Sequence, residues 1–426
     1  MYNSFIKNFA ALVIFFVLGV ALPNSTTLGQ GNFNMPYSVY GVGELRFGEY
    51  FQNMRMGGIS QGYSSNVSIN DVNPASYAAL DSVSFVFETT LFSHFLEQET
   101  QVAKQRSDYI SLGNISFGFP VTRWWSFAAG LKPYSSLGYT IRDREEQNAG
   151  IVNYLYEGEG GLNQLFIGSA FKPADGLSVG VNASYIFGNL DYEASVVSDV
   201  LGVYQTNLTS ANQVNGWVFG FGMQYRHEFS QYQNITFGAT FGNRQDVNIS
   251  STEALKRRLT REMFYDTISF VESEKANLSL PAYYGFGVFG RLNNNWSAGI
   301  DYKWQNWEGF EFPGRQGEYN NSYQVAAGVE FAPTIETFST FFHRLKYAAG
   351  LRYGQSYFMP GGEPLNEFGI SFGTSIPIRG SLSGLSLNFE YSRRGSEDRH
   401  IIQENFYRIN IGINIYENWF VRRRFY

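Results

Sequence analysis

The chain has no cysteine, few charged residues and, beyond its first thirty residues, no long unbroken apolar run. Without cysteine it can form no disulfide, and the exported form carries no lipid on a cysteine. Charged residues make up 16% of the chain, whereas soluble globular proteins contain roughly a quarter. No stretch after residue 30 is long and apolar enough for a membrane-spanning helix. These absences disfavour an ordinary soluble domain and a helical membrane protein alike.

Recognisable catalytic and metal-binding patterns are also missing. The histidines are scattered along the chain, at His94, His227, His343 and His400. There is no His-x-x-x-His pair, no Gly-x-Ser-x-Gly turn and no cysteine-based site. We therefore predict a non-enzyme without cofactor or metal, although a Ser–His pair assembled across strands would leave no such pattern. The net charge of −6 provides no basic surface, so nucleic acid is not an expected partner.

The N-terminus has the features of a secretory signal in residues 1–30. Lys7 precedes an apolar run from Phe9 to Leu22, which Pro23 ends. The run is short for a bilayer span, so a membrane anchor is the less favoured alternative. Export without a later spanning helix leaves two classes, a soluble secreted protein or an outer-membrane barrel.

Strict alternation of apolar and polar residues favours the barrel. Near the C-terminus, Tyr407, Ile409, Ile411 and Ile413 alternate with Arg408, Asn410, Gly412 and Asn414. An arginine and two asparagines facing the dry core of a sandwich would be costly. The same residues suit the wet lumen of a membrane barrel.

The alternation recurs in about fourteen segments, an even count that suits a closed bacterial barrel. They start near Val83, Asp108, Trp125, Ile151, Leu177, Gln205, Gln233, Asn277, Trp296, Ser322, Leu345, Glu367, Leu385 and Ile401. Short turns alternate with longer polar loops at about 96–107, 191–212, 248–278 and 308–321. We predict an all-β, transmembrane antiparallel barrel over residues 81–426, in the outer membrane of a Gram-negative bacterium. The alternatives are a secreted sandwich or a propeller, and no blade-length repeat supports the latter.

Residues 31–80 precede the first predicted strand and fit no regular element. Gly57 and Gly58 permit close approach to other backbone. Pro74 has no amide hydrogen and biases Asn73 away from helical geometry, so Asn73-Pro74-Ala75 predicts a fixed bend. We interpret this segment as a plug, or hatch, inside the lumen. Whether it moves or only fills space is left open by the sequence.

The Gly57-Gly58 start, the polar stretch and Asn73-Pro74-Ala75 before the first strand together resemble the hatch of the FadL/TodX-type (OmpP1) outer-membrane transporters. The resemblance implies a fourteen-stranded barrel with an N-terminal hatch, and passive inward diffusion of long-chain fatty acids or other hydrophobic compounds. It also implies a kinked third strand that opens sideways toward the bilayer. Lys132-Pro133-Tyr134 lies in the third predicted strand, where proline cannot donate to a sheet ladder. The alternative is a proline at the rim of the strand.

Other residues are binding candidates by composition and position. Aromatic, Met and Arg side chains near the start of the exported chain predict a pocket for an apolar ligand with a carboxylate, or ordinary packing of the hatch: Phe47, Phe51, Met54 and Arg55. Basic and apolar residues are interspersed at roughly helical spacing in 248–278. This pattern is compatible with three alternatives: an outer capture surface, a solvated helix or a contact with lipopolysaccharide.

The expected partners are a hydrophobic small molecule, outer-membrane lipid and lipopolysaccharide, and the barrel-assembly machinery, whose signals generally end in an aromatic residue such as Tyr426. We expect a monomer. Two alternative functions are a structural or secretion-system partner barrel and a general diffusion porin.

Overall fold

The computed structural model describes residues 34–46, 50–100, 104–147, 150–198, 204–259, 264–273, 275–315, 317–333, 341–378, 381–395 and 402–419. The predicted signal peptide, Phe33, Phe47 and the C-terminal residues 420–426 lie outside these ranges. Within them, no helix combines the length and apolar character needed to cross a membrane.

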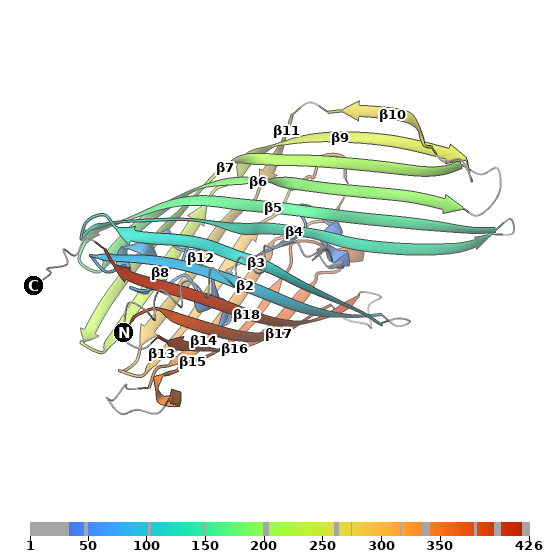
Figure 1. Ribbon diagram of the computed structural model, residues 1–426. Coiled ribbons are helices and arrows are strands. Elements are labelled where there is room, and N and C mark those ends of the chain that lie inside the picture. The colour runs from blue at the N-terminus through green and yellow to red at the C-terminus, as the bar shows by residue number, and fades with distance from the viewer. Residues whose placement is uncertain are drawn as a thin grey trace, which may run out of the picture.

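A single antiparallel sheet closes on itself, because the last strand, β18, pairs with β2 (Figure 1). The sheet contains 18 strands, but not all are separate strands of the wall. The short β1 pairs with β4 and is not a wall strand, β8 and β9 form one wall strand, and β10, β11 and β12 form another. The wall therefore has fourteen strands, as the sequence predicts. The elements are η1 (Pro36–Val39), β1 (Glu44–Leu45), α2 (Phe51–Met54), η2 (Pro74–Ala79), β2 (Ser84–Glu99), β3 (Lys104–Pro120), β4 (Trp125–Gln147), β5 (Gly150–Ala174), β6 (Leu177–Ser198), β7 (Tyr204–Ser230), β8 (Gln233–Gly242), β9 (Gln245–Leu259), β10 (Asp266–Glu272), β11 (Ala276–Leu280), β12 (Ala282–Arg291), β13 (Trp296–Asn306), β14 (Ser322–Phe331), η3 (Phe341–Arg344), β15 (Lys346–Gln355), η4 (Pro360–Gly362), β16 (Asn366–Pro377), β17 (Gly384–Arg394) and β18 (Gln403–Asn418).

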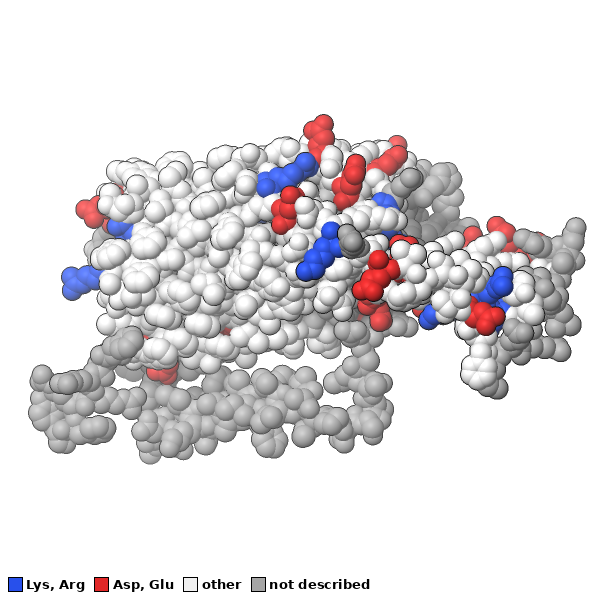
Figure 2. All heavy atoms as spheres, turned by 90° about the horizontal axis from the view of Figure 1, so that it is seen from above, with Lys and Arg blue, Asp and Glu red and all other residues white. Residues whose placement is uncertain are grey.

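The alternation in sequence sorts side chains to the two faces of this wall. Ile409 and Ile411 on β18 are exposed on the outside, whereas Asn410 and Asn414 are buried inside. The outer face is a broad uncharged band, and charged side chains gather mostly toward one end (Figure 2). An even-stranded closed barrel with an apolar belt is the outer-membrane architecture, and the predicted location is therefore confirmed.

The wall is much taller on one side than on the other. β5 has 25 residues and β7 has 27, whereas β14 and β15 have 10 each. The outer ends of β4–β7, β9 and β10 extend past the other strands as a flat sheet, here called the projecting sheet (Figure 1).

The projecting sheet corrects two expectations about loops. Most of 191–212 and 248–278 is strand rather than loop, and Lys256, Arg257 and Arg258 belong to β9, not to a helix. In these segments consecutive residues are polar on both faces of the strand, as in Gln205-Thr206-Asn207 of β7, so backbone pairing continues while the apolar alternation fades. That loss made the strands read as polar loops.

Residues 50–80, here called the inner segment, lie directly against glycines on the inner face of the wall. A Cβ on Gly180 of β6 would lie 2.5 Å from the carbonyl carbon of Pro74, and one on Gly222 of β7 would lie 2.1 Å from the Asn73 side chain. Gly350 of β15 and Gly412 of β18 face Gly57 and Phe51 in the same way. Wall glycines thus leave the space that the inner segment occupies.

This packing predicts a difference between two glycine substitutions. Gly180→Ala forces a methyl group into Pro74, and overpacking of this kind costs about 1–3 kcal/mol. Gly290→Ala on β12 is the matched control, because its Cβ would meet nothing closer than 3.4 Å. Urea unfolding of the two refolded barrels should show a lower free energy of unfolding for Gly180→Ala only. Equal stabilities would mean that the inner segment does not pack on β6 as described.

Candidate functional site

The wall is interrupted between β3 and β4. These strands pair from Pro120 and Ser126 only as far as Ile115 and Leu131. Farther out they diverge, and β3 continues with β2 while β4 continues with β5 (Figure 1). Pro133 lies two residues beyond the last β3–β4 pair, at a register shift between β4 and β5. A proline has no amide hydrogen to offer a ladder, so the chain leaves regular pairing at this position.

The N-terminal segment, residues 34–46, fills this wall break. Its strand β1 pairs antiparallel with β4, with Glu44 opposite Ser136 and Leu45 opposite Ser135. The amide of Met35 donates to the Gly138 carbonyl over 2.7 Å. The Asn34 side chain bonds both the amide and the carbonyl of Thr140, at 2.9 and 3.2 Å. These bonds satisfy backbone groups of β4 that would otherwise face the break.

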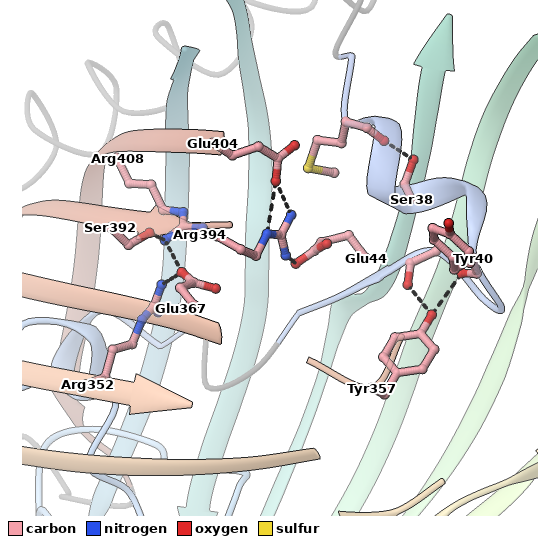
Figure 3. A network of polar contacts seen from close by, with 12 residues as sticks. Ser38, Tyr40, Glu44, Arg352, Tyr357, Glu367, Ser392, Arg394, Glu404 and Arg408 are labelled. Carbon is pink, nitrogen blue, oxygen red and sulfur yellow. Dashed lines mark hydrogen bonds and ion pairs between the residues drawn. The ribbon is translucent and has the colours of Figure 1, made fainter. Parts of the chain in front are cut away.

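Two tyrosines hold the segment from other sides. The Tyr357 hydroxyl, from the loop after β15, donates toward the carbonyls of Tyr40 and Gly43, at 2.9 and 2.7 Å (Figure 3). The Tyr37 hydroxyl donates to the Ile402 carbonyl over 2.8 Å. Burial raises the pKa of both hydroxyls, so each stays protonated and able to donate near neutral pH.

An ion cluster ties the same segment to β17 and β18. Arg394 is 1% exposed, and its guanidinium lies between two carboxylates, 2.6 Å from Glu44 and 2.6 Å from Glu404 (Figure 3). Glu44 is the member that belongs to the N-terminal segment. Buried charges persist only when paired, and removing one partner is strongly destabilising. A neighbouring set of ion pairs links Arg352 and Arg408 to Glu367 and Glu390.

The inner segment is held by polar contacts to widely separated wall strands. Asp301 of β13 accepts from the amides of Ser60 and Gln61, at 2.6 and 2.8 Å. The Asp71 carboxylate lies 2.5 Å from the ammonium of Lys132 on β4. The predicted hatch residues Gly57, Gly58, Asn73, Pro74 and Ala75 all lie in this segment, and both glycines have positive φ, at 73° and 93°.

The predicted bend occurs at Asn73. Its side-chain oxygen accepts from the amide of Ala75 over 3.1 Å, and the short 3₁₀ helix η2 follows from Pro74. Its side-chain nitrogen donates to the Gln61 carbonyl over 2.7 Å. Asn73 therefore fixes both the local turn and its distance from an earlier part of the same segment.

A cavity of about 330 Å³ lies between the two segments and the wall. Its lining mixes apolar and charged groups from many strands, including Leu45, Arg46, Met54, Lys132, Tyr134, Val218, Phe219, Gln245, Leu280, Tyr283, Trp304, Tyr357 and Phe358. Lys132 and Tyr134 of the predicted gate and Met54 of the predicted pocket belong to it, whereas Pro133, Phe51 and Arg55 do not.

Phe51 and Arg55 have other contacts. The Phe51 ring packs over Gly412, and Arg55 forms an ion pair with Glu330 of β14. Most lining residues of the cavity were missed by sequence reasoning, because single inward side chains from separate strands leave no local pattern. No group of three or more potential metal ligands occurs among the residues that the structure describes.

The ion cluster yields a prediction about the N-terminal segment. Arg394→Met leaves Glu404 buried and Glu44 partly buried without their cation, a loss of about 3–5 kcal/mol for breaking a buried pair. Residues 34–46 should therefore lose protection in amide hydrogen exchange. Arg393→Met, at the exposed neighbouring position, is the control and should leave protection unchanged. Unchanged protection in Arg394→Met would show that the cluster does not hold the segment.

Comparison with solved structures supports the fold. The structure is similar to a Pseudomonas aeruginosa FadL homologue, with a TM-score of 0.58 and 12% identity, covering 88% of this chain and 99% of that chain. It is similar to the toluene transporter TodX of Pseudomonas putida, with a TM-score of 0.58 and 15% identity over the same shares. The FadL/TodX resemblance noted from the sequence is confirmed at the level of fold.

Comparison by sequence identifies one family. No curated protein matches the chain. The model of one family, BamG, matches residues 5–426, nearly the whole length. The protein therefore belongs to the BamG family.

Proposed function

We propose that this protein is an outer-membrane channel for passive uptake of hydrophobic compounds, with the wall break between β3 and β4 as its lateral gate. The observation that carries the proposal is the position of the cavity. Its lining includes Leu45 of the N-terminal segment and Tyr134 of β4, and at the break Leu45 lies opposite Ser135, the residue after Tyr134. Residues 34–46 both line the cavity, through Leu45 and Arg46, and pair with β4 at the break, so they lie between a compound in the cavity and the break.

In this proposal the inner segment is the hatch that closes the direct route through the lumen. It contacts strands around the wall, from Lys132 on β4 and Asp301 on β13 to Gly412 on β18. An open diffusion porin would need this space unoccupied. A hydrophobic compound would instead enter the cavity and leave sideways near Lys132, Pro133 and Tyr134, into the bilayer.

The lining suggests the chemistry of the cargo. Apolar and aromatic side chains accept chains of variable shape, since their contacts are non-directional, and Met54 adds an adaptable one. Arg46 places a cationic group in the same lining, which suits a carboxylate, whereas Lys132 is already paired with Asp71. This lining supports long-chain fatty acids as cargo beside neutral hydrocarbons.

A disulfide staple tests the gate. Leu45 and Ser135 are directly opposite in an antiparallel pair, where Cβ atoms lie about 4.5–5.5 Å apart. In the double variant Leu45→Cys with Ser135→Cys, oxidation should form a disulfide that holds the break closed. Reductant should cleave that disulfide and let the break open again. The chain has no other cysteine to interfere. Uptake of a labelled fatty acid into proteoliposomes should fall on oxidation and recover on reduction.

A second cysteine pair is the control for that staple. Val329→Cys with Ala349→Cys joins two paired strands, β14 and β15, away from the break. Its oxidation should leave uptake unchanged. Undiminished uptake through the oxidised Leu45–Ser135 staple would refute the lateral gate.

A partner barrel is the second candidate, favoured by the projecting sheet. β10 pairs with β9 along one side and with no other strand among the described residues. Its apolar side chains Ile268, Phe270 and Val271 are exposed, Phe270 by 63%. An unpaired apolar edge is a template for pairing with another chain. Membership of the BamG family is compatible with a barrel that acts in an assembly.

Charge placed on the β10 edge tests this candidate. Phe270→Lys should abolish co-purification of a bound protein after extraction in mild detergent, because a lysine blocks edge pairing. Asn153→Lys on exposed β5 is the control and should retain the bound protein. A wild-type barrel that purifies alone would contradict the partner role.

A further inference from the structure

A second interruption lies in the wall between β7 and the joined strands β8 and β9. β7 pairs with β8 up to Phe221 opposite Phe241, and with β9 from Asn215 opposite Asn248. Residues 216–220 of β7 have no ladder partner in β8 or β9. The next strand pair is interrupted at the same level. β8 pairs with β12 as far as Gly242 opposite Tyr283, and β9 pairs with β11 as far as Gln245 opposite Leu280. Pro281 lies between β11 and β12.

One side chain bridges this second break. The Gln245 side-chain oxygen accepts from the amide of Phe219 over 2.6 Å, and its side-chain nitrogen donates to the Phe219 carbonyl over 2.8 Å. The amide group thus replaces one rung of the missing backbone ladder. Lipid offers no hydrogen-bonding partner to an open strand edge, which gives this side chain a structural reason to be there.

The second break lies between the cavity and the lipid-facing surface. The cavity lining includes Val218, Phe219, Gln245 and Pro281 at the break itself. Phe219 is also 46% exposed on the outside of the barrel, beside Trp217 and Phe221 at 52% and 47%. Phe219 therefore borders both the cavity and the outer apolar belt.

The inner side of the second break is closed by Tyr283. A Cβ added to Gly220 or Gly242 would lie within 2.1 or 2.2 Å of the Tyr283 side chain. The two glycines leave the space in which that ring lies. Among the described residues, the side chains of Tyr283 and Gln245 lie in the break, Val247 packs beside them against Gly216, and no continuous ladder joins β7 to β8 and β9 there.

We infer that this second break is a side-chain gate through which apolar compounds exchange directly between the cavity and the surrounding lipid. Opening requires rotation of Gln245 and Tyr283 about side-chain torsions, whereas the β3–β4 break requires the paired segment 34–46 to leave. Side-chain rotation is far faster than segment displacement. The inference rests on the proposed function in that the cargo is a hydrophobic compound, and it adds a second route at a different place in the wall.

Gln245→Ala tests the gate through the exchange rate of the apolar fluorophore N-phenyl-1-naphthylamine, measured by stopped flow on the purified full-length barrel in proteoliposomes. Loss of the two hydrogen bonds to Phe219 should speed both saturable binding and release by about tenfold. Gln213→Ala is the matched control, since Gln213 is an exposed residue of β7 opposite Ser250 in intact pairing. It should exchange the probe at the wild-type rate.

Amide hydrogen exchange makes the result decisive. The Phe219 amide must lose protection in Gln245→Ala while the rest of β7 keeps it. If that amide is exposed and the probe still exchanges at the wild-type rate, the inference is overturned. Gln245→Asn, whose side chain is too short to span the break, replaces Gln245→Ala if that barrel fails to assemble, and carries the same expectation.

The oxidised Leu45–Ser135 staple separates this inference from the proposed function. Faster exchange by Gln245→Ala in the stapled barrel supports the second route by itself. Exchange that responds to the staple and not to Gln245→Ala overturns the second route and leaves the β3–β4 gate standing. Absence of saturable probe binding in every variant, wild type included, overturns both.

Discussion

The structure depends on the need to satisfy every backbone amide and carbonyl of a wall that faces lipid. In a regular barrel, strand pairing alone does so, but here β3 and β4 part beyond Ile115 and Leu131 and leave β4 with an open edge. Residues 34–46 supply the missing partners through β1, Met35 and Asn34. The segment therefore completes the wall at the break without being one of its fourteen strands. Its position beside the cavity makes it suited to act as a gate.

The interior is organised by space and charge together. Glycines such as Gly180, Gly222 and Gly350 remove side chains where the inner segment touches the wall. Paired charges then fix the segments at chosen points, with Asp71 on Lys132 and Glu44 on Arg394. Apolar contacts alone would hold the same segments without specifying which wall residue each one faces. Ion pairs specify both the partner residue and its position.

The sequence was enough for the barrel and for the irregular part of the N-terminus, because alternation and turn chemistry are local signals. The predicted starts near Val83, Trp125 and Leu177 agree with β2, β4 and β6. The sequence did not predict how far the strands extend above the bilayer, because the alternation fades there. It did not predict the cavity either. Residues such as Tyr283, Trp304 and Gln245 line it from separate strands, and only the closure of the barrel brings them together. Arg55 shows the same limit, since nothing local reveals its ion pair with Glu330, 275 positions away.

The central claim is that this barrel holds a hydrophobic compound next to an opening that residues 34–46 close. Mass spectrometry of the intact protein, purified in mild detergent, measures this most directly. We expect a small hydrophobic molecule to be retained by the wild-type barrel and to be released when Arg394→Met frees the N-terminal segment. A barrel that carries no such molecule and instead retains a second protein would contradict it and favour the partner role.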